Sequence, residues 1–465
     1  MPNHLQKAAK PKHHLLRQVT TQRAEIRDPI HGYIYASELE RELIDTPELQ
    51  RLRRIRQLAG CHLVYPGGQH SRFEHVIGCM FLAGKVGTVL SDVSPEFSEF
   101  DLYKLRIAAL LHDVGHGPFS HMFEEVMAEK SDFTHEDMTR RIVRETEIGD
   151  ILAKYGFSRP AIADLAVGKS EKERPFMNDV IGGGLSVDIM DYLLRDSYFT
   201  GVEYGKVDVH RIINSFEVVN HRLAISQAAL FAFEAMMISR YEMFRAVYFH
   251  RTVRAAELML IKSMTLADKV LHLTDLSLSN YLSLTDEVTL NRIVTLDPGQ
   301  DEDLILAKKL AIDYQRRKLL KCVFEKTVQR RDKFLTSIFN QKSFRDSLAA
   351  QIADKARVNV SEVFVDVPTA PSVPVSAARK SLQEITVVHS RSKNPDNRSE
   401  GHAARSKAKR SGAYQMRISD LPLIGEIEGF LDVMRVYTTE ESRLKVSRAA
   451  EALFGGEGFE QKISM

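Results

Sequence analysis

Hydrophobic residues recur every three or four positions along most of the chain. The pattern is clearest over 47–58, 73–90, 103–115 and 226–253, and each of these stretches predicts a helix with a buried face. One stretch, 360–367 (VSEVFVDV), instead alternates apolar and polar residues, which is typical of a strand. We therefore expect a mainly α fold with a small α+β region near the C-terminus.

The same pattern, together with shifts in composition, divides the chain into five regions. These are a mobile basic arm (1–22), a helical core (23–265), a helical extension ending in a strand (266–367), a linker or loop rich in Pro, Ser and basic residues (368–412), and a small α+β segment with a tail (413–465). The last region predicts a strand, a helix and a second strand, which we expect to form a small sheet with 360–367.

Composition narrows the class of protein. With 465 residues, 44% of them hydrophobic, the chain is long enough to bury a large core. The net charge of +2 gives no general reason to expect binding to nucleic acid or membrane. Three scattered cysteines, Cys61, Cys79 and Cys322, fit a reducing compartment. No secretory signal and no run of about 18 apolar residues is evident, so we expect a cytoplasmic protein.

Candidate metal ligands occur in three separate stretches. His75 lies at the start of one predicted helix, His112 and Asp113 end another, and Asp188 begins a third. Imidazole and carboxylate ligands together suit Fe, Mn, Zn or Mg and exclude a thiolate zinc site. A lone His-Asp pair is common by chance, and His75 alone would more often lie on a helix surface, so the metal site depends on all three stretches converging.

A polar stripe follows Asp188. Asp188, Asp191, Tyr192, Arg195 and Asp196 have the spacing of one helix face, which is usually the spacing of core residues. We expect this stripe to line a polar pocket. The alternative is a solvated face carrying an Asp191–Arg195 pair worth a few tenths of a kcal/mol.

Several longer motifs carry a family resemblance. The segments DPIHGYI, IDTPELQRLRRIRQLAG, HSRFEHVIG, LLHDVGHGPFSHMFE, THED and VDIMDYLLRD occur in this order. They resemble the catalytic core of the HD-domain deoxynucleoside triphosphate (dNTP) triphosphohydrolases, from about residue 26 to 254 and more loosely to 367. No SAM domain, which some members carry, is expected here. The resemblance implies an HD-type helical core that hydrolyses a dNTP to a deoxynucleoside and inorganic triphosphate.

The resemblance also implies roles for individual catalytic residues. His121 matches the acid that protonates the leaving 5′-oxygen, and Glu124 would orient it, although the family usually has Asp there. His135 and Glu136 match a supporting pair. His116 matches a residue that binds phosphate oxygens during catalysis.

Other matches concern substrate binding. Arg72 and Arg240 match arginines that bind phosphate, and Tyr248 matches a tyrosine that leaves no room for a ribose 2′-hydroxyl. The sugar would also meet Gln57, Leu58, Tyr192 and Asp196, with Gln57 and Asp196 binding the 3′-hydroxyl. One departure is Ile189, where mammalian members have lysine.

A second nucleotide site is also implied. Asp45, Gln50 and Arg53 match residues that read guanine in an allosteric GTP or dGTP effector, and the resemblance implies a homo-oligomer, either dimer or tetramer. The segment DTPE has a structural interpretation as well, in which Asp45 caps a helix and Glu48 is its third residue. Both interpretations can hold together.

Two other functions stay open. The chain could be an HD-superfamily phosphohydrolase acting on a different nucleotide. It could instead be a nucleotide-sensing or nucleic-acid-binding module that uses the basic run from Arg391 to Arg410, which has seven Lys or Arg residues against two acids. In the leading interpretation the cofactors are a divalent metal at the HD site and Mg²⁺ bound with the nucleotide.

Overall fold

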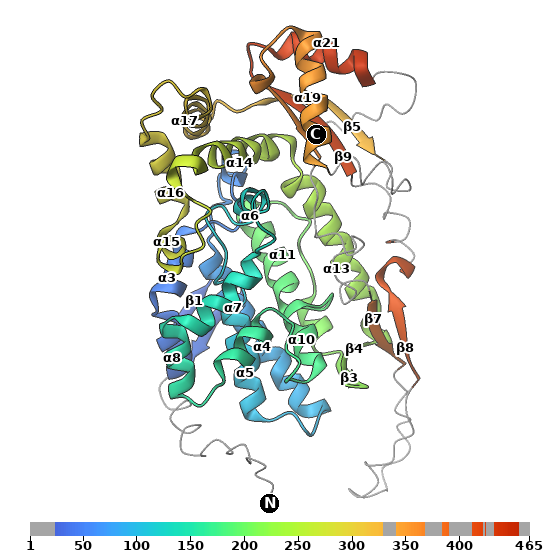
Figure 1. Ribbon diagram of the computed structural model, residues 1–465. Coiled ribbons are helices and arrows are strands. Elements are labelled where there is room, and N and C mark those ends of the chain that lie inside the picture. The colour runs from blue at the N-terminus through green and yellow to red at the C-terminus, as the bar shows by residue number, and fades with distance from the viewer. Residues whose placement is uncertain are drawn as a thin grey trace, which may run out of the picture.

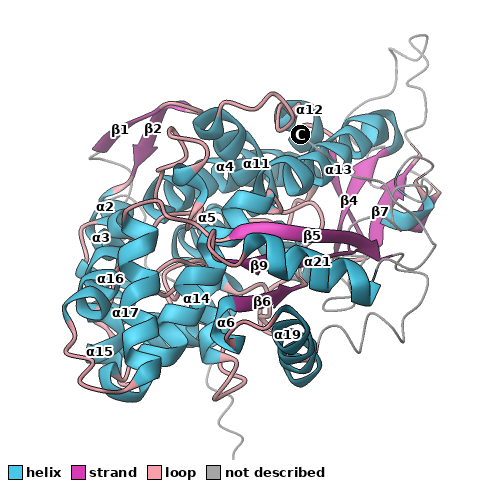
Figure 2. Ribbon diagram, turned by 90° about the horizontal axis from the view of Figure 1, so that it is seen from above, coloured by secondary structure: helices cyan, strands magenta, loops and turns pink. Residues whose placement is uncertain are grey.

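The computed structural model describes residues 24–328, 341–367, 384–389, 412–421, 424 and 432–454. Helices dominate these residues, so the predicted mainly α class with a small α+β part is confirmed (Figure 1, Figure 2). The first group of helices is α2 (Glu38–Ile44), α3 (Pro47–Arg51), α4 (Arg72–Val93), α5 (Glu99–Leu111), α6 (His121–Met127), α7 (His135–Glu145), α8 (Glu147–Lys154), α9 (Arg159–Ala166), α10 (Pro175–Gly182), α11 (Val187–Thr200), α12 (Val209–Ile213) and α13 (Leu230–Met243). The later helices are α14 (Arg251–Leu271), α15 (Leu278–Ser283), α16 (Asp286–Thr295), α17 (Glu302–Gln315), α19 (Lys342–Ala356) and α21 (Arg443–Phe454).

Helix α4 is the central helix of the core. It begins at a capping box in which the Ser71 amide donates to the Glu74 carboxylate at 2.6 Å. Helices α5 and α11 pack against it. By length and composition α4 could cross a membrane, which corrects the expectation that no segment reaches that threshold. More than half of its apolar window is buried inside the fold, and Arg72 and His75 are buried as well.

The strands form three small sheets. Strands β1 (Ala24–Asp28) and β2 (Gly32–Ala36) make a hairpin; β3 (Phe216–Val219), β4 (Arg222–Ser226), β7 (Glu384–Val388) and β8 (Ala413–Arg417) form the second sheet; β5 (Lys321–Val328), β9 (Asp432–Thr438) and β6 (Val363–Asp366) form the third. The predicted strand at 360–367 is confirmed as β6, and it pairs with β9.

Two expectations about the sheets were incomplete. Strand β8 does not join β6, because it pairs with β7, which lies inside the expected linker 368–412. The hairpins β1–β2 and β3–β4 fall in the region 23–265, where helical patterns dominate and no strand was predicted. The basic arm, the run from Arg391 to Arg410 and the residues after Phe454 lie outside the described residues, and the domain boundaries stay predictions.

The long helix predicted over 226–253 is interrupted. Helix α13 continues into one π-helical turn, Phe244–Tyr248, where the Phe249 amide donates to the Phe244 carbonyl at 2.7 Å. The chain then restarts as α14, whose first turn is capped by the His250 side chain. Single π turns inside helices often occur at functional sites. This one carries Tyr248.

The third sheet, with α19 and α21 packed on it, forms one end of the molecule (Figure 1). Arg254 on α14 binds Asp366 on β6 through two hydrogen bonds of 2.8 and 3.1 Å. Arg435 on β9 donates to the Phe249 carbonyl at 2.6 Å. Both arginines are buried, so the small sheet is attached to α14 by specific polar contacts rather than by apolar packing alone.

Candidate metal and catalytic site

The four predicted metal ligands converge from three helices. His75 comes from α4, His112 and Asp113 from the end of α5, and Asp188 from the first turn of α11. His75 Nε2 lies 3.2 Å from Asp188 Oδ1 and 3.7 Å from Asp113 Oδ2. His112 Nε2 lies 3.3 Å from Asp113 and 3.8 Å from Asp188. Two imidazoles and two carboxylates thus face one small volume.

The donor set fits a divalent metal. His112 Nδ1 donates to the Ala109 carbonyl at 2.8 Å, which leaves the lone pair on Nε2. That Nε2 is buried and has no hydrogen-bond partner. A buried unpaired nitrogen is costly unless something binds it. A cation held by His75, His112, Asp113 and Asp188 would satisfy it.

A second layer of residues orients His75. Asp191 Oδ2 accepts from His75 Nδ1 at 2.9 Å, which turns Nε2 toward the metal-binding volume. Asp191 also contacts His31 at 2.7 Å and Arg195 at 2.8 Å. Asp191 and Arg195 are both 0% exposed. The predicted polar stripe therefore faces inward, and the alternative of a solvated Asp191–Arg195 pair is wrong.

Gly78 allows α11 to approach α4 this closely. A Cβ at Gly78 would lie 1.9 Å from Asp191 Oδ1 and 2.5 Å from an Arg195 nitrogen. No side chain can be accommodated there without moving the residues that orient His75. The glycine in the motif EHVIG thus has a packing role that the sequence alone did not reveal.

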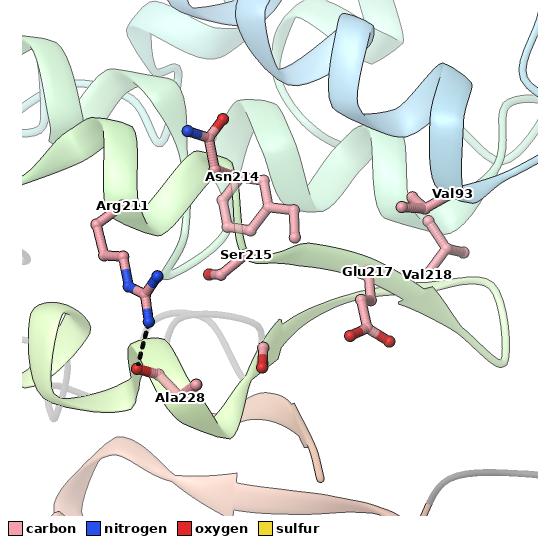
Figure 3. Close-up of a pocket in the computed structure, with 9 residues that line it drawn as sticks. Val93, Arg211, Asn214, Ser215, Glu217, Val218 and Ala228 are labelled. Carbon is pink, nitrogen blue, oxygen red and sulfur yellow. Dashed lines mark hydrogen bonds between the residues drawn. The ribbon is translucent and has the colours of Figure 1, made fainter. Parts of the chain in front are cut away.

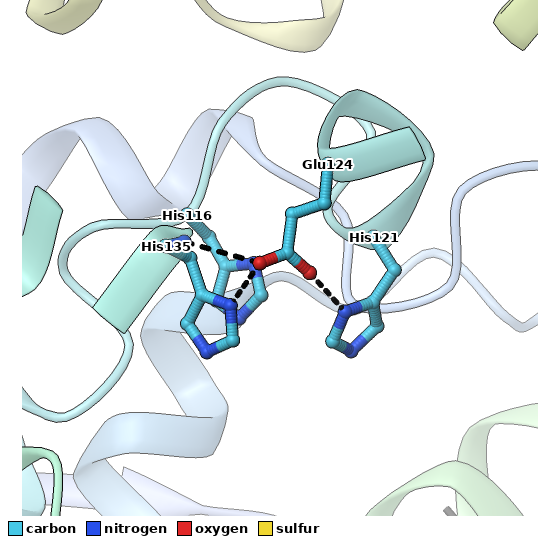
Figure 4. A group of neighbouring side chains, drawn as sticks. All are labelled: His116, His121, Glu124 and His135. Carbon is cyan, nitrogen blue, oxygen red and sulfur yellow. Dashed lines mark hydrogen bonds and ion pairs between the residues drawn. The ribbon is translucent and has the colours of Figure 1, made fainter. Parts of the chain in front are cut away.

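Three histidines and one carboxylate gather beside the metal ligands (Figure 4). Glu124 accepts from His121 Nδ1 at 2.8 Å and also bonds to His135 Nδ1. Burial would raise the pKa of Glu124, but the charges and hydrogen bonds of His135 and His121 hold it far below its usual value. The ionised Glu124 thus fixes the orientation of both imidazole rings through their Nδ1 atoms.

His116 connects this cluster to the metal ligands. Its ring stacks on His135 at 3.9 Å, and its Nε2 lies 3.4 Å from Asp113. Burial and the nearby Arg72 hold the pKa of His116 well below its usual value, so it is neutral. Glu136, in contrast, forms an ion pair with Lys169 at 2.6 Å. It is Glu124 that bonds to His121 and His135.

The predicted sugar site is organised around Asp196. Tyr248 donates its hydroxyl to Asp196 at 2.6 Å, and Tyr192 lies edge-on to Tyr248 at 6.5 Å. His70 contacts the other Asp196 oxygen at 2.7 Å, a partner that sequence reasoning missed because it is 126 positions away. Gln57 Oε1 is buried without a partner. Leu58 packs at the edge of the core.

Cationic groups are available for phosphate. Arg240 is buried, and its Nε and Nη1 have no hydrogen-bond partner. Arg72 donates from Nε to Ser120 at 2.7 Å and also contacts Asp113. Ile189 is buried in the hydrophobic core, so this position itself supplies no charge to a phosphate. The unpaired donors of Arg240 are of the kind that bind phosphate oxygens.

The candidate effector residues lie on the surface. Asp45 is 60% exposed in its side chain and pairs with Arg41, while Arg53 donates to Gln50 at 2.8 Å. The cap predicted here is wrong in register. Thr46 caps α3, and Asp45 instead ends α2, because the Thr46 hydroxyl accepts from the Leu49 amide.

A surface pocket of about 370 Å³ lies elsewhere, along α12, β3 and the turn after β4 (Figure 3). Arg211 at its rim donates to the Ala228 carbonyl at 3.0 Å. None of the predicted site residues lines this pocket.

The helical core brings two histidines and two aspartates together, and two of these four residues are the adjacent His112 and Asp113 at the end of α5. This arrangement is typical of the HD class of proteins. Comparison with known protein families leads to the same class. Residues 72–196 match the HD domain, and residues 207–392 match the HD associated region. The chain belongs to the HD-domain phosphohydrolase family.

Individual relatives support this placement. The chain is 36% identical to the uncharacterized protein YwfO of Bacillus subtilis over 58% of this chain and 63% of that one. It is 31% identical to the deoxynucleoside triphosphate triphosphohydrolase SAMHD1 homolog of Dictyostelium discoideum, over 70% of this chain and 64% of that one. It therefore spans less than two thirds of these relatives' length. A hypothetical protein from Aquifex aeolicus superposes with a TM-score of 0.68 at 25% identity, covering 92% of this chain and 100% of the other.

Proposed function

We propose that this protein hydrolyses dNTPs to a deoxynucleoside and inorganic triphosphate. The observation that carries the proposal is the Tyr248–Asp196 hydrogen bond of 2.6 Å beside the buried, unpaired donors of Arg240. A sugar in this site meets a ring that is fixed in place, and a phosphate chain meets a guanidinium that needs a partner. The similarity to a triphosphohydrolase relative supports the same reaction.

The chain's own residues have separable roles in this reaction. Arg72 and Arg240 bind triphosphate oxygens, and the Tyr248 ring excludes a ribose 2′-hydroxyl. A divalent metal at the HD site would polarise the phosphate and lower the pKa of bound water. Water attacks the α-phosphorus and forms the new phosphorus–oxygen bond as the bond between that phosphorus and the 5′-oxygen breaks. His121 donates a proton to the leaving 5′-oxygen, and Glu124 holds the imidazole in place through its hydrogen bond to Nδ1.

The metal is one of Fe, Mn, Zn or Mg, and Mg²⁺ accompanies the nucleotide. We further propose that a guanine nucleotide, GTP or dGTP, binds Asp45, Gln50 and Arg53 in a homo-oligomer of the cytoplasmic protein. Asp45 and Arg53 are exposed and Gln50 is half-buried, and the Arg53 guanidinium also lies 3.5 Å from the centroid of the Phe73 ring. A pocket around these residues would be completed by a second subunit or by the nucleotide itself.

The decisive experiment is a product assay. Purified protein is incubated with each dNTP, with ATP and with a deoxynucleoside monophosphate, in the presence of Mn²⁺ or Mg²⁺, and products are separated by ion chromatography. Inorganic triphosphate from dNTPs and little from ATP supports the proposal. Orthophosphate from the monophosphate alone would identify a phosphohydrolase of different substrate class.

A further inference from the structure

The loop that leads to His121 is bent at two residues with unusual backbone angles. Phe119 has φ 58° and Ser120 has φ 57°, and neither is glycine. Such backbone angles are unfavourable for a residue with a side chain and persist only where neighbours hold them. His121 follows at once as the first residue of α6. The position of the proposed acid therefore depends on whatever holds this bend.

Asp286 makes the contact that holds it. The Phe119 amide donates to Asp286 Oδ1 at 2.6 Å, and the Arg56 amide donates to Oδ2 at 3.0 Å. The Asp286 side chain is 1% exposed. Arg56 directly precedes Gln57 and Leu58. One carboxylate thus connects the backbone of the acid loop to the backbone of the sugar-binding segment.

Neighbouring contacts strengthen the same connection. The Ser120 hydroxyl donates to the Arg56 carbonyl at 2.7 Å and accepts from Arg72 Nε at 2.7 Å. Tyr281 donates its hydroxyl to the Gly115 carbonyl at 2.7 Å. Asp286 and Tyr281 both lie outside the matched HD domain, within the HD associated region.

Asp286 is not required for the helix on which it lies. Thr285 is the N-cap of α16 and accepts from the Val288 amide. Burial raises the pKa of Asp286 to about 6, so keeping it ionised at neutral pH costs stability. An exposed first-turn residue, such as its neighbour Glu287, would favour the helix without that cost. The burial of Asp286 therefore points to a role in the loop.

We propose that Asp286 is a positioning residue for the proton-transfer step, setting His121 against the bound sugar by fixing Phe119 relative to Arg56. The inference rests on the proposed function. It assigns to the HD associated region an indirect part in catalysis, because Asp286 acts through the Phe119 and Arg56 amides.

The test compares Asp286→Asn with Glu287→Gln. Asparagine offers one acceptor oxygen to two amides, whereas Glu287 is 59% exposed and contacts only the Arg56 side chain, at 3.2 Å, among the described residues. We expect kcat for the hydrolysed dNTP to fall about tenfold or more in Asp286→Asn, with a smaller change in KM. Glu287→Gln should change kcat by less than about twofold.

Hydrogen exchange provides a readout that does not depend on activity. Asp286→Asn should speed amide exchange in peptides covering 114–122 and 54–58, while peptides from α5 keep the wild-type rate. Unchanged kcat with unchanged loop exchange would overturn the inference, and so would a loss of kcat that comes only with faster exchange throughout the chain. A wild type that releases no triphosphate would instead overturn the proposed function, and the exchange of the loop would still be measurable.

Discussion

The candidate catalytic pocket and the candidate effector residues differ in how complete they are within one chain. In the pocket, His75 is oriented by buried Asp191, and the side chains that face the substrate volume keep unpaired atoms, as in His112 and Arg240. In the effector set, Asp45 and Arg53 are exposed and already paired with neighbours.

The difference shows which site is preorganised. Buried polar atoms without partners are costly, so we expect the fold to retain them where a ligand will bind. Exposed side chains that pair with one another have little need of a ligand, and ordering them around one requires another surface. We therefore expect catalysis to depend strongly on single pocket residues, and regulation to depend weakly on single effector residues.

The largest effect should follow removal of a metal ligand. His112→Ala should lose both bound metal and all hydrolysis. The variant should retain its helical content, because a catalytic metal site with open coordination positions does not hold the fold together. Metal analysis and circular dichroism measure this. Cys79→Ala is the matched control, because Cys79 Sγ lies 3.6 Å from His75 Nδ1 without belonging to the predicted set. Loss of metal in the control, or its retention in His112→Ala, would contradict the assignment.

The second-largest effect should follow removal of His121, the proposed general acid. His121→Ala should lower kcat by about 10²–10⁴-fold, the usual contribution of general acid catalysis, with metal content unchanged. Glu124→Gln should lower kcat less, because the imidazole remains but loses its ionised partner. If Glu124→Gln proved more harmful than His121→Ala, the carboxylate and not the imidazole would be the acid.

Replacing Asp191, which orients His75, should reduce activity less than replacing a metal ligand or His121. Asp191→Asn should weaken metal affinity by about 10–100-fold, which is typical when a partner behind a ligating histidine is lost. Competition with a chelator measures the affinity. Asp92→Asn, on the exposed end of α4, is the control and should bind metal as wild type does.

Sugar discrimination should respond to ring volume rather than to the Tyr248 hydroxyl. Tyr248→Ala should raise kcat/KM for ATP relative to dATP by about 10-fold or more, whereas Tyr248→Phe should keep the wild-type ratio. Phenylalanine loses the bond to Asp196 but fills the same space. A relaxed ratio in Tyr248→Phe would show that the hydrogen bond, and not the ring, selects the sugar.

The smallest effect should be regulatory. Arg53→Ala should abolish stimulation by GTP, a change of several-fold at a coupling of about 1–3 kcal/mol. Arg54→Ala is the neighbouring control and should keep the stimulation. Sedimentation with and without GTP reports assembly. A wild type that is fully active and assembled without nucleotide would remove the effector part of the proposal and leave the catalytic part intact.

The convergence of much of the candidate catalytic pocket could be predicted because its residues lie in short motifs. His112, Asp113, His116 and His121 occur within one stretch of ten residues, and their convergence with His75 required only that three helices pack together. The mainly α fold followed from periodicity for the same reason, since the apolar spacing of α4 and α5 is local.

The supporting contacts could not be predicted from local patterns. Asp286 reaches Phe119 across 167 positions, and no spacing rule connects them. Strand β7 (EITVV) does have a local strand signal in its four β-branched residues, but it lies in a stretch of linker-like composition, and its pairing with β4 and β8 is not local. Asp45 was assigned as a cap because Asp and Thr both suit that position, and the structure has Thr46 there.

The pairing of β7 with β8 also bears on how such a chain can change in length. Val388 lies opposite Ala413, so the two ends of the intervening stretch are held together by the sheet. The entropy of closing a loop rises only slowly with its length, by about 0.6 kcal/mol for each doubling. Residues can therefore be gained or lost between these strands at little cost to folding. This connection is therefore a place where an evolving gene could add a recognition module, or an experimenter a fluorescent tag, while the β7–β8 pairing is kept.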